Sequence, residues 1–194
     1  MTNIAQQLEQ FLQALASNAN YALIVLICLW LLHIFNSILG YRLNYLGIIP
    51  RRLAGLPGIV FFSFLHGDYN HIFFNSIPLF ILLCFLLTYG LHFAIVVTIY
   101  IILIAGILTW VFGRNAIHIG ASSLIMGYFG FLLVNAYYNI SVNSILIAFV
   151  CLYYFGGLFF SIFPTRERIS WEGHLFGLIA GILVGYLSFH ISLV

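Results

Sequence analysis

Apolar residues fill most of four long stretches that contain no charged side chain: 11–41, 69–113, 115–165 and 173–194. A helix needs about 20 apolar residues to cross the hydrocarbon core of a bilayer, which is about 30 Å thick. The first and last stretches each hold one such helix, and each middle stretch is long enough for a hairpin of two. The pattern therefore predicts six membrane-spanning helices, at about residues 21–39, 71–89, 93–111, 123–138, 145–163 and 173–192.

Two other segments are predicted to lie at the membrane surface. Residues 1–18 place Ile4, Leu8 and Leu15 on one helical face, a pattern typical of an amphipathic helix in the interface. The first ten residues lack a basic region, so no cleavable signal peptide is expected. The loop between the first two spans carries prolines, glycines and arginines together with many large apolar residues, and we expect it to lie half-embedded beside the spans.

The composition agrees with a membrane protein and excludes several other classes. Of the 194 residues, 64% are hydrophobic and 5% are charged, whereas soluble domains carry about 25% charged residues. So few charges cannot cover a water-exposed surface, which excludes a soluble enzyme, a disordered chain and a nucleic-acid binder that uses basic patches. Cys28, Cys84 and Cys151 each stand alone in a predicted span, without metal or redox spacing, and are expected to be packed thiols.

A few polar residues lie within the predicted spans, where such groups are costly and are therefore candidates for function. His71 and Asn75 are four residues apart and project from one face of the second span. His174 begins the sixth span, in which glycine recurs at every fourth position from Gly177 and forms a smooth face that another helix can approach closely. Taken alone, the pair is typical of a hydrogen-bonded contact between helices, and the glycines are typical of a packing ridge.

Ser122 begins the fourth span, after Gly120 and Ala121. A serine at this place is most often a helix cap. The first N–H groups of a helix, however, also lack partners and lie at the positive end of the helix dipole. Such groups stabilise the oxyanion that forms when a hydroxyl attacks a carbonyl carbon. A hydroxyl, an imidazole and a polar pair on three different spans are therefore the parts of a hydrolytic site.

These residues resemble those of the rhomboid intramembrane serine proteases, and the resemblance extends from the first loop to the sixth span. The HIFFN sequence at 71–75 is similar to the HxxxN pattern of the second span, and GAS at 120–122 is similar to the nucleophile turn before the fourth. The HLFG sequence at 174–177, with Gly181, is similar to the base-bearing stretch of the sixth span, and His66 fits an upstream histidine. Each motif is weak alone, but their order within a six-span frame is specific.

The resemblance implies a fold, a reaction and residue roles. The expected fold is an all-α integral membrane protein, a rhomboid-like bundle of six transmembrane helices in one domain over residues 1–194. Ser122 would be the nucleophile and His174 the general base, a dyad without an acidic third member. His71 and Asn75 would stabilise the oxyanion together with the backbone N–H of Ser122. The expected activity is that of a serine endopeptidase that cuts transmembrane segments of other membrane proteins, without a metal or other cofactor, in a bacterial-type inner membrane.

The chain departs from the family pattern at three places. Ser123 stands where the family commonly has glycine, so a second hydroxyl lies next to Ser122. Met126 stands where many members carry an aromatic ring that stacks on the catalytic histidine, and its thioether can still contact an imidazole. The first loop has Arg51 and Arg52 in place of a Trp-Arg pair. None of these changes removes a catalytic group.

The sequence lacks the residues that three other classes of membrane protein require. An intramembrane metalloprotease needs a motif such as HExxH, and no histidine here is followed by glutamate. An aspartyl protease needs two buried aspartates, and Asp68 is the only aspartate. A transporter would need an intramembrane acid for ion coupling, and the predicted spans hold none. A rhomboid-like protein that binds transmembrane segments without cutting them stays open as the alternative, although such relatives generally lose the serine or the histidine.

The arginines and the resemblance point to opposite orientations. All six lie in the loops after spans 1, 3 and 5, and the positive-inside rule would place those loops in the cytoplasm. The same loops flank Ser122 and His174. The resemblance implies that the dyad opens toward the outer side of the membrane, with both termini inside.

Overall fold

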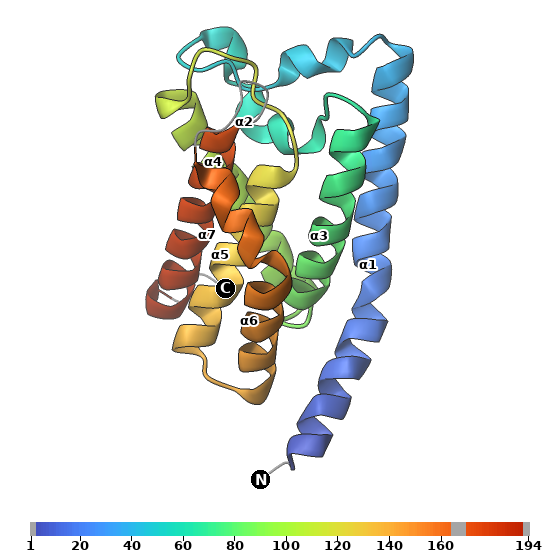
Figure 1. Cartoon of the computed structure of the whole chain (residues 1–194), viewed down its shortest axis with the longest axis vertical. Helices are drawn as coiled ribbons and strands as arrows, with labels where there is room; N and C mark the ends of the chain where they lie inside the picture. The colour runs from blue at the N-terminus through green and yellow to red at the C-terminus, as the bar shows by residue number, and fades with distance from the viewer. Residues whose placement is uncertain (1–2, 164–169, 192–194) are drawn as a thin grey trace.

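The computed structural model describes residues 3–163 and 170–191, and the described residues form helices joined by short loops. One isolated antiparallel bridge, between Ile48 and His118, occurs among them. Figure 1 shows the long helices arranged side by side as a bundle. They are α1 (Ile4–Ile38), α3 (Tyr69–Leu87), α4 (Leu91–Phe112), α5 (Ser122–Tyr138), α6 (Val142–Phe155) and α7 (Trp171–Ile191). Short helices follow α1 and α6: η1 (Arg42–Leu46), η2 (Leu53–Gly55), α2 (Gly58–Phe61), η3 (Phe62–Phe64) and η4 (Gly156–Ile162).

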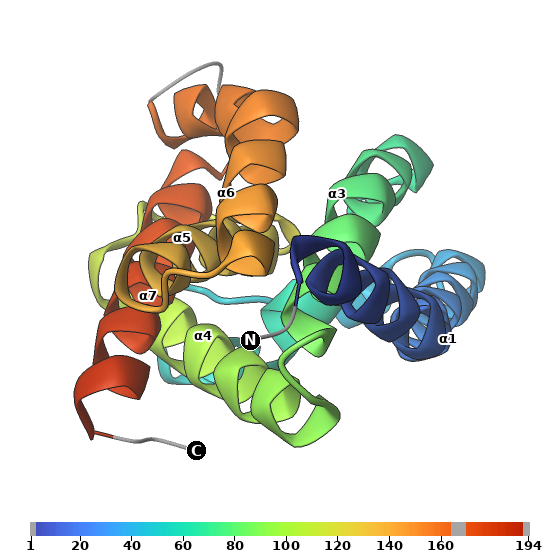
Figure 2. The ribbon, with the colours of Figure 1, turned by 90° about the horizontal axis from the view of Figure 1, so that it is seen from below.

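Five helical segments within the described ranges are long and apolar enough to cross a membrane: α1, α3, α4, α7 and the continuous stretch Val142–Ile162. The remaining long helix, α5, has 17 residues, a length of about 26 Å at about 1.5 Å per residue. Its residues 123–132 are all buried, and Figure 2 shows it in the interior, between α4, α6 and α7. A helix that is apolar on every side belongs in the centre of a bundle. The expected all-α membrane bundle is therefore confirmed.

Helix α1 differs from what the sequence predicts. A surface helix over residues 1–18 and a separate span over 21–39 were expected, but the structure has a single helix of 35 residues. Asn3 caps its start in a capping box with Gln6. The polar residues near its middle do not interrupt it, because Ser17 and Asn18 both donate side-chain hydrogen bonds to the carbonyl of Ala14. The expected interfacial segment is thus the first part of one continuous helix.

The end of the fifth predicted span also differs from a regular α-helix. The α-helical part stops at Phe155, and the chain continues from Gly156 to Ile162 as the 3₁₀ helix η4. Two consecutive glycines, Gly156 and Gly157, begin this segment, and glycine is a poor α-helix former. The loop expected at 164–168 lies outside the described residues.

The glycine face of α7 packs directly against the backbone of α5. A Cβ atom added to Gly177 would overlap the carbonyl oxygen of Ser123, and one added to Gly181 would overlap that of Gly127. Only glycine permits this approach at both positions. The close packing brings the start of α7, which carries His174, next to the start of α5, which carries Ser122.

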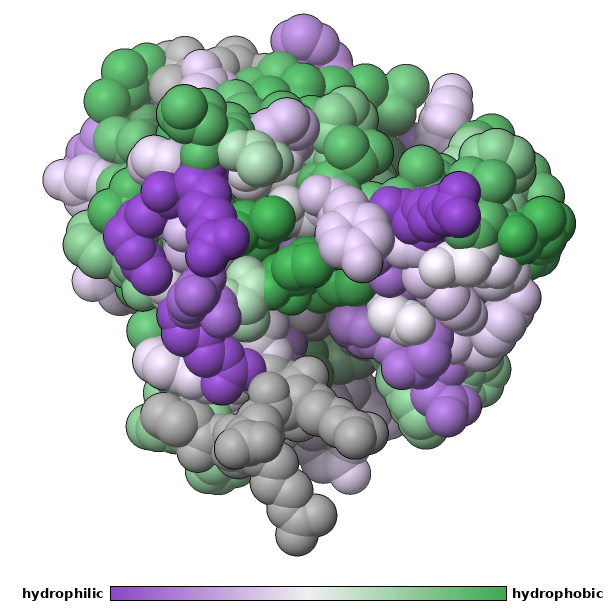
Figure 3. Space-filling view, turned by 90° about the horizontal axis from the view of Figure 1, so that it is seen from above, coloured by the Kyte–Doolittle hydropathy of each residue, from purple (hydrophilic) through white to green (hydrophobic). Residues whose placement is uncertain are grey.

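The first loop is fixed to the end of α4 by backbone and arginine hydrogen bonds. One guanidinium nitrogen of Arg51 donates to the carbonyls of Val111, at 3.1 Å, and Gly113, at 2.7 Å. The indole N–H of Trp110 donates to the carbonyl of Arg52 at 3.0 Å. A cation is favourable at the carbonyl end of a helix. The loop is therefore held over the same end of the bundle as the turn that precedes α5, and polar residues lie among apolar ones on this end face (Figure 3).

Candidate active site

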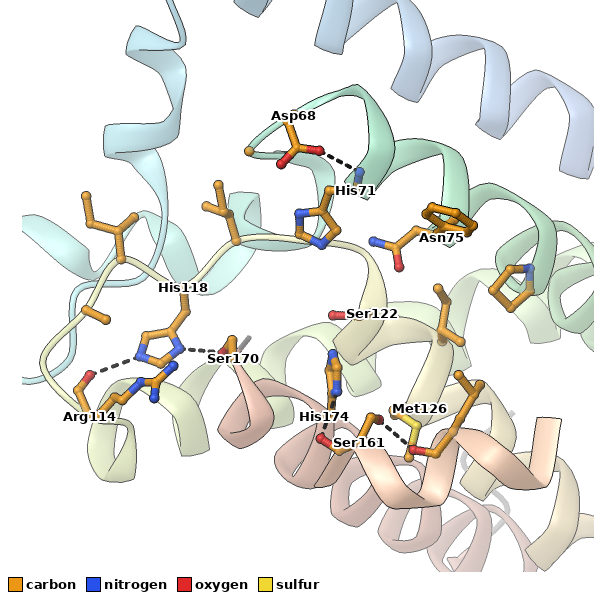
Figure 4. Close-up of a pocket in the computed structure, with 18 residues that line it drawn as sticks. Asp68, His71, Asn75, Arg114, His118, Ser122, Met126, Ser161, Ser170 and His174 are labelled. Atoms are coloured by element: carbon orange, nitrogen blue, oxygen red, sulfur yellow. Dashed lines mark hydrogen bonds between the residues drawn. The ribbon is translucent and has the colours of Figure 1, made fainter. Parts of the chain in front are cut away.

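The residues predicted to form a hydrolytic site line one cavity of about 590 Å³. His71 and Asn75 reach it from α3, Ser122 from the start of α5 and His174 from the start of α7. Figure 4 shows the four side chains pointing into the same space, and Met126 also lines the cavity. The helix packing thus brings together all four residues that the sequence singled out.

Ser122 is the first residue of α5 and follows a turn that only glycine can form well. Gly120 has φ +127°, and a Cβ atom added there would lie 2.7 Å from Nε2 of His71. Both the backbone conformation and the crowding exclude larger residues. The same added Cβ would lie 3.6 Å from the Ser122 hydroxyl oxygen. The turn therefore presents Ser122 and His71 to each other across Gly120.

The two neighbouring serines have different surroundings. Ser122 is half-buried and lines the cavity. Ser123 is only 2% exposed, does not line the cavity, and its hydroxyl has no hydrogen-bond partner within the described ranges. Its backbone is in contact with Gly177 of α7. A substrate in the cavity would therefore meet Ser122, whereas Ser123 faces the helix interface.

The ring of His174 is oriented by a backbone carbonyl. Nδ1 of His174 lies 3.1 Å from the carbonyl oxygen of Ser161 in η4. Because a carbonyl only accepts, Nδ1 carries the hydrogen, and this assignment leaves the lone pair on Nε2. In Figure 4 the ring lies between Ser161 and the hydroxyl of Ser122. No hydrogen bond joins Ser122 and His174 in the described structure, and catalytic contacts of this kind often tighten only when substrate binds.

The polar pair on α3 offers hydrogen-bond donors to the cavity. The Nδ2 atom of Asn75 is buried and has no partner among the residues that the structure describes. The pair is held in place by Asp68, whose carboxylate caps α3 by accepting from the His71 backbone N–H at 2.8 Å. The pair and the free N–H groups at the start of α5 therefore offer donors to the cavity that Ser122 also lines. Such an arrangement can stabilise an anionic oxygen.

His66 is hydrogen-bonded to the turn before Ser122. It is 1% exposed, and its Nε2 accepts a hydrogen bond from the Ala121 N–H at 3.4 Å. Burial, with a smaller contribution from the neighbouring His71, lowers the pKa of His66 from 6.5 to about 3. His66 is therefore neutral at ordinary pH, as a hydrogen-bond acceptor must be at that nitrogen.

The neutral state of His66 makes the protein's stability depend on pH. Between about pH 3 and 6.5 the unfolded chain binds a proton at this residue and the folded chain does not, so acidification favours unfolding. From pH 7.5 to 5.5 this residue should remove about 1.4 kcal/mol from the free energy of unfolding. Thermal unfolding in detergent at both pH values should show a smaller pH effect for His66→Gln, which keeps an acceptor without titrating. Equal pH effects in both proteins would contradict the assignment.

His118 also lines the cavity, although the sequence did not single it out. His118 is buried, and burial lowers its pKa. Its Nε2 lies 3.0 Å from the Arg114 carbonyl, and its Nδ1 lies 2.6 Å from the hydroxyl of Ser170, just before α7. Nearby, the guanidinium of Arg114 pairs with the buried carboxylate of Glu172 at 3.4 Å. These contacts tie the loop before α5 to the start of α7. Because the partners are more than 50 residues apart, no local pattern points to them.

Comparisons with known proteins identify the family of this chain. Residues 54–191 match the family model described as Rhomboid domain. Uncharacterized proteins of Mycobacterium tuberculosis and Mycobacterium bovis are each 34% identical over 168 residues, which is 82% of this chain and 70% of the relative. An uncharacterized protein of Mycobacterium leprae is 32% identical over 168 residues, 82% of this chain and 66% of the relative. The range that matches the family model, residues 54–191, includes His71, Asn75, Ser122 and His174. The chain is a multi-pass membrane protein, and it belongs to the rhomboid family.

Proposed function

We propose that the protein is an intramembrane serine endopeptidase in which Ser122 is the nucleophile and His174 the general base. The observation that carries the proposal is the convergence of Ser122, His174, His71 and Asn75 on one cavity. The hydrogen bond from His174 Nδ1 to the Ser161 carbonyl supports it, because it leaves Nε2 free to accept a proton. Family membership supports the same class of reaction.

The proposed reaction proceeds in two halves. Nε2 of His174 takes the hydroxyl proton of Ser122 as Oγ bonds to the carbonyl carbon of the scissile peptide. The same proton passes to the leaving amine as the C–N bond breaks, which leaves an ester on Ser122. Water then attacks the ester, giving one proton to His174, and that proton returns to Ser122 as the acid product leaves. The base needs no carboxylate partner in this scheme, because the Ser161 carbonyl holds its tautomer.

The oxyanion of both tetrahedral intermediates would be held by His71, Asn75 and the N–H of Ser122. Asn75 is the clearest test, because its Nδ2 has no partner in the described structure and would gain one only with the intermediate. We expect Asn75→Ala to lower kcat by about 10²–10³-fold, the usual effect of removing one such donor. KM should change little, as measured by steady-state cleavage. If kcat/KM fell by the same factor because KM rose while kcat stayed unchanged, Asn75 would be assigned to substrate binding instead.

The proposed substrates are transmembrane segments of other membrane proteins. The site lies among spanning helices near one end of the bundle, so a helical segment would have to unwind locally to present an extended peptide bond. We propose that this end faces the outer side of a bacterial-type inner membrane. Two of the arginines at this end have local structural partners: Arg51 is bound to carbonyls at the end of α4 and Arg114 to Glu172.

Proteolysis in liposomes tests the proposal. The purified protein would be reconstituted with a single-span model substrate that has small and helix-destabilising residues near one end of its span. We expect two fragments whose new termini, determined by mass spectrometry, lie near that end. A folded protein that binds the substrate but leaves it intact would instead indicate the alternative, a rhomboid-like protein that recognises transmembrane segments without cutting them.

A further inference from the structure

The segment η4 is an unusual way to end a membrane-spanning helix. It contains seven residues in 3₁₀ conformation, whereas 3₁₀ runs longer than about three or four residues are uncommon. A continued α-helix would satisfy the backbone equally well and is the expected conformation in a membrane. The long 3₁₀ run therefore suggests a function for this conformation.

Close packing does not require glycine at the start of η4. A Cβ atom added to Gly156 or Gly157 would meet no atom within 4 Å, and neither has a positive φ in the range that disfavours other residues. This differs from Gly177 and Gly181, where close packing requires glycine. The remaining physical effect of Gly156 and Gly157 is their low preference for the α-helix.

The conformation of η4 determines where the carbonyl of Ser161 points. A 3₁₀ helix turns by about 120° per residue and rises about 2.0 Å, against about 100° and 1.5 Å for an α-helix. Over the five residues from Gly156 to Ser161, the two conformations differ by about 100° in direction and about 2.5 Å in height. An α-helical continuation would therefore turn the Ser161 carbonyl away from Nδ1 of His174, which it now meets at 3.1 Å.

We propose that η4 is a positioning segment, in which Gly156 and Gly157 maintain the 3₁₀ conformation so that the Ser161 carbonyl orients His174. The inference rests on the proposed function of His174 as general base. Ser161 acts through its backbone and does not touch the reacting atoms. Among the described residues no carboxylate is hydrogen-bonded to the imidazole, and Met126, which lines the same cavity, has no hydrogen-bond donor. The Ser161 carbonyl is the described hydrogen-bond partner of the ring.

A substitution series at Gly157 tests this inference. Preference for the α-helix rises from glycine through serine and valine to alanine, whereas side-chain volume rises from glycine through alanine and serine to valine. If conformation controls the base, kcat should be highest for glycine, intermediate for Gly157→Ser and Gly157→Val, and lowest for Gly157→Ala. We expect a fall in kcat of about 3- to 10-fold for Gly157→Ala, the effect of losing one hydrogen bond, with KM within about twofold of wild type. Gly156→Ala/Gly157→Ala should fall further.

The control is Tyr153→Ala, an exposed position one turn earlier in α6 (71% exposed), where the change adds alanine without altering the start of η4. Thermal midpoints in detergent should stay close to wild type for all single variants at Gly157. Full kcat in Gly157→Ala, or a loss that follows side-chain volume, would overturn the inference while leaving the proposed function intact. A folded wild type that neither cuts nor reacts with a fluorophosphonate would contradict the proposed function, and the inference with it.

Discussion

Ser122→Ala is expected to abolish cleavage of a transmembrane substrate, with a loss in kcat of at least about 10³-fold. The substitution removes the hydroxyl that lines the cavity on the side of the His174 ring opposite Ser161 (Figure 4). It should leave the fold intact, because the described structure gives this hydroxyl no hydrogen-bond partner that would be lost. The measurement is fragment formation in liposomes, followed long enough to detect cleavage at about 10⁻⁴ of the wild-type rate.

The matched control is Ser123→Ala, one residue further along α5. The Ser123 hydroxyl is buried against α7 and has no partner in the described ranges. Its removal takes away a group that is costly to bury, so we expect unchanged activity and equal or higher thermal stability. Activity that survives Ser122→Ala but disappears in Ser123→Ala would overturn the assignment of the nucleophile.

His174→Ala is expected to reduce kcat by a similar factor, because a serine hydroxyl is a weak nucleophile without a base to take its proton. Losses of this size are not additive when two residues act as a unit. The double variant Ser122→Ala/His174→Ala should therefore be no slower than either single variant. Additive losses would indicate that the two residues act in separate steps.

A second substitution at His174 separates proton transfer from packing. In His174→Asn, the side-chain amide can still donate toward the Ser161 carbonyl and fill part of the same space, but it cannot accept a proton at neutral pH. We expect this variant to match wild type in thermal midpoint and His174→Ala in lack of activity. Substantial cleavage by His174→Asn would mean that His174 has only a structural role.

Helix packing rules explain part of how the site assembles, whereas the roles predicted for its residues came from the resemblance to the rhomboid family. The spacing of His71 and Asn75 places them on one face of α3, and both line the cavity. The glycines of α7 predict a close neighbour, and the backbone of α5 does pack against Gly177 and Gly181. In both cases the sequence periodicity is that of an α-helix, so the structural consequence follows directly.

The features that were not predicted depend on the backbone or on distant partners. The carbonyl that orients His174 belongs to Ser161, and any residue at that position would supply the same atom, so the sequence contains no signal for it. The contact of His118 with Ser170 joins segments 52 residues apart. The two glycines that begin η4 are visible in the sequence, but an apolar stretch of this length is equally consistent with a regular span.

Helix α1 shows a different limit of sequence reasoning. The change from amphipathic to uniformly apolar residues near its middle predicts two segments, yet no glycine or proline stands there to end the first. The polar side chains of Ser17 and Asn18 bond to a carbonyl one turn earlier and so are satisfied within the helix. Composition alone therefore does not mark a helix boundary.

The central claim is that Ser122 is a nucleophile activated by His174, and reaction with a fluorophosphonate probe tests it most directly. The folded protein in detergent would be treated with the probe, digested and analysed by mass spectrometry to locate the modified residue. The account predicts a single covalent adduct on Ser122, which is absent in His174→Asn. An adduct on Ser123, or an unmodified Ser122 in a preparation that cuts its substrate, would contradict it.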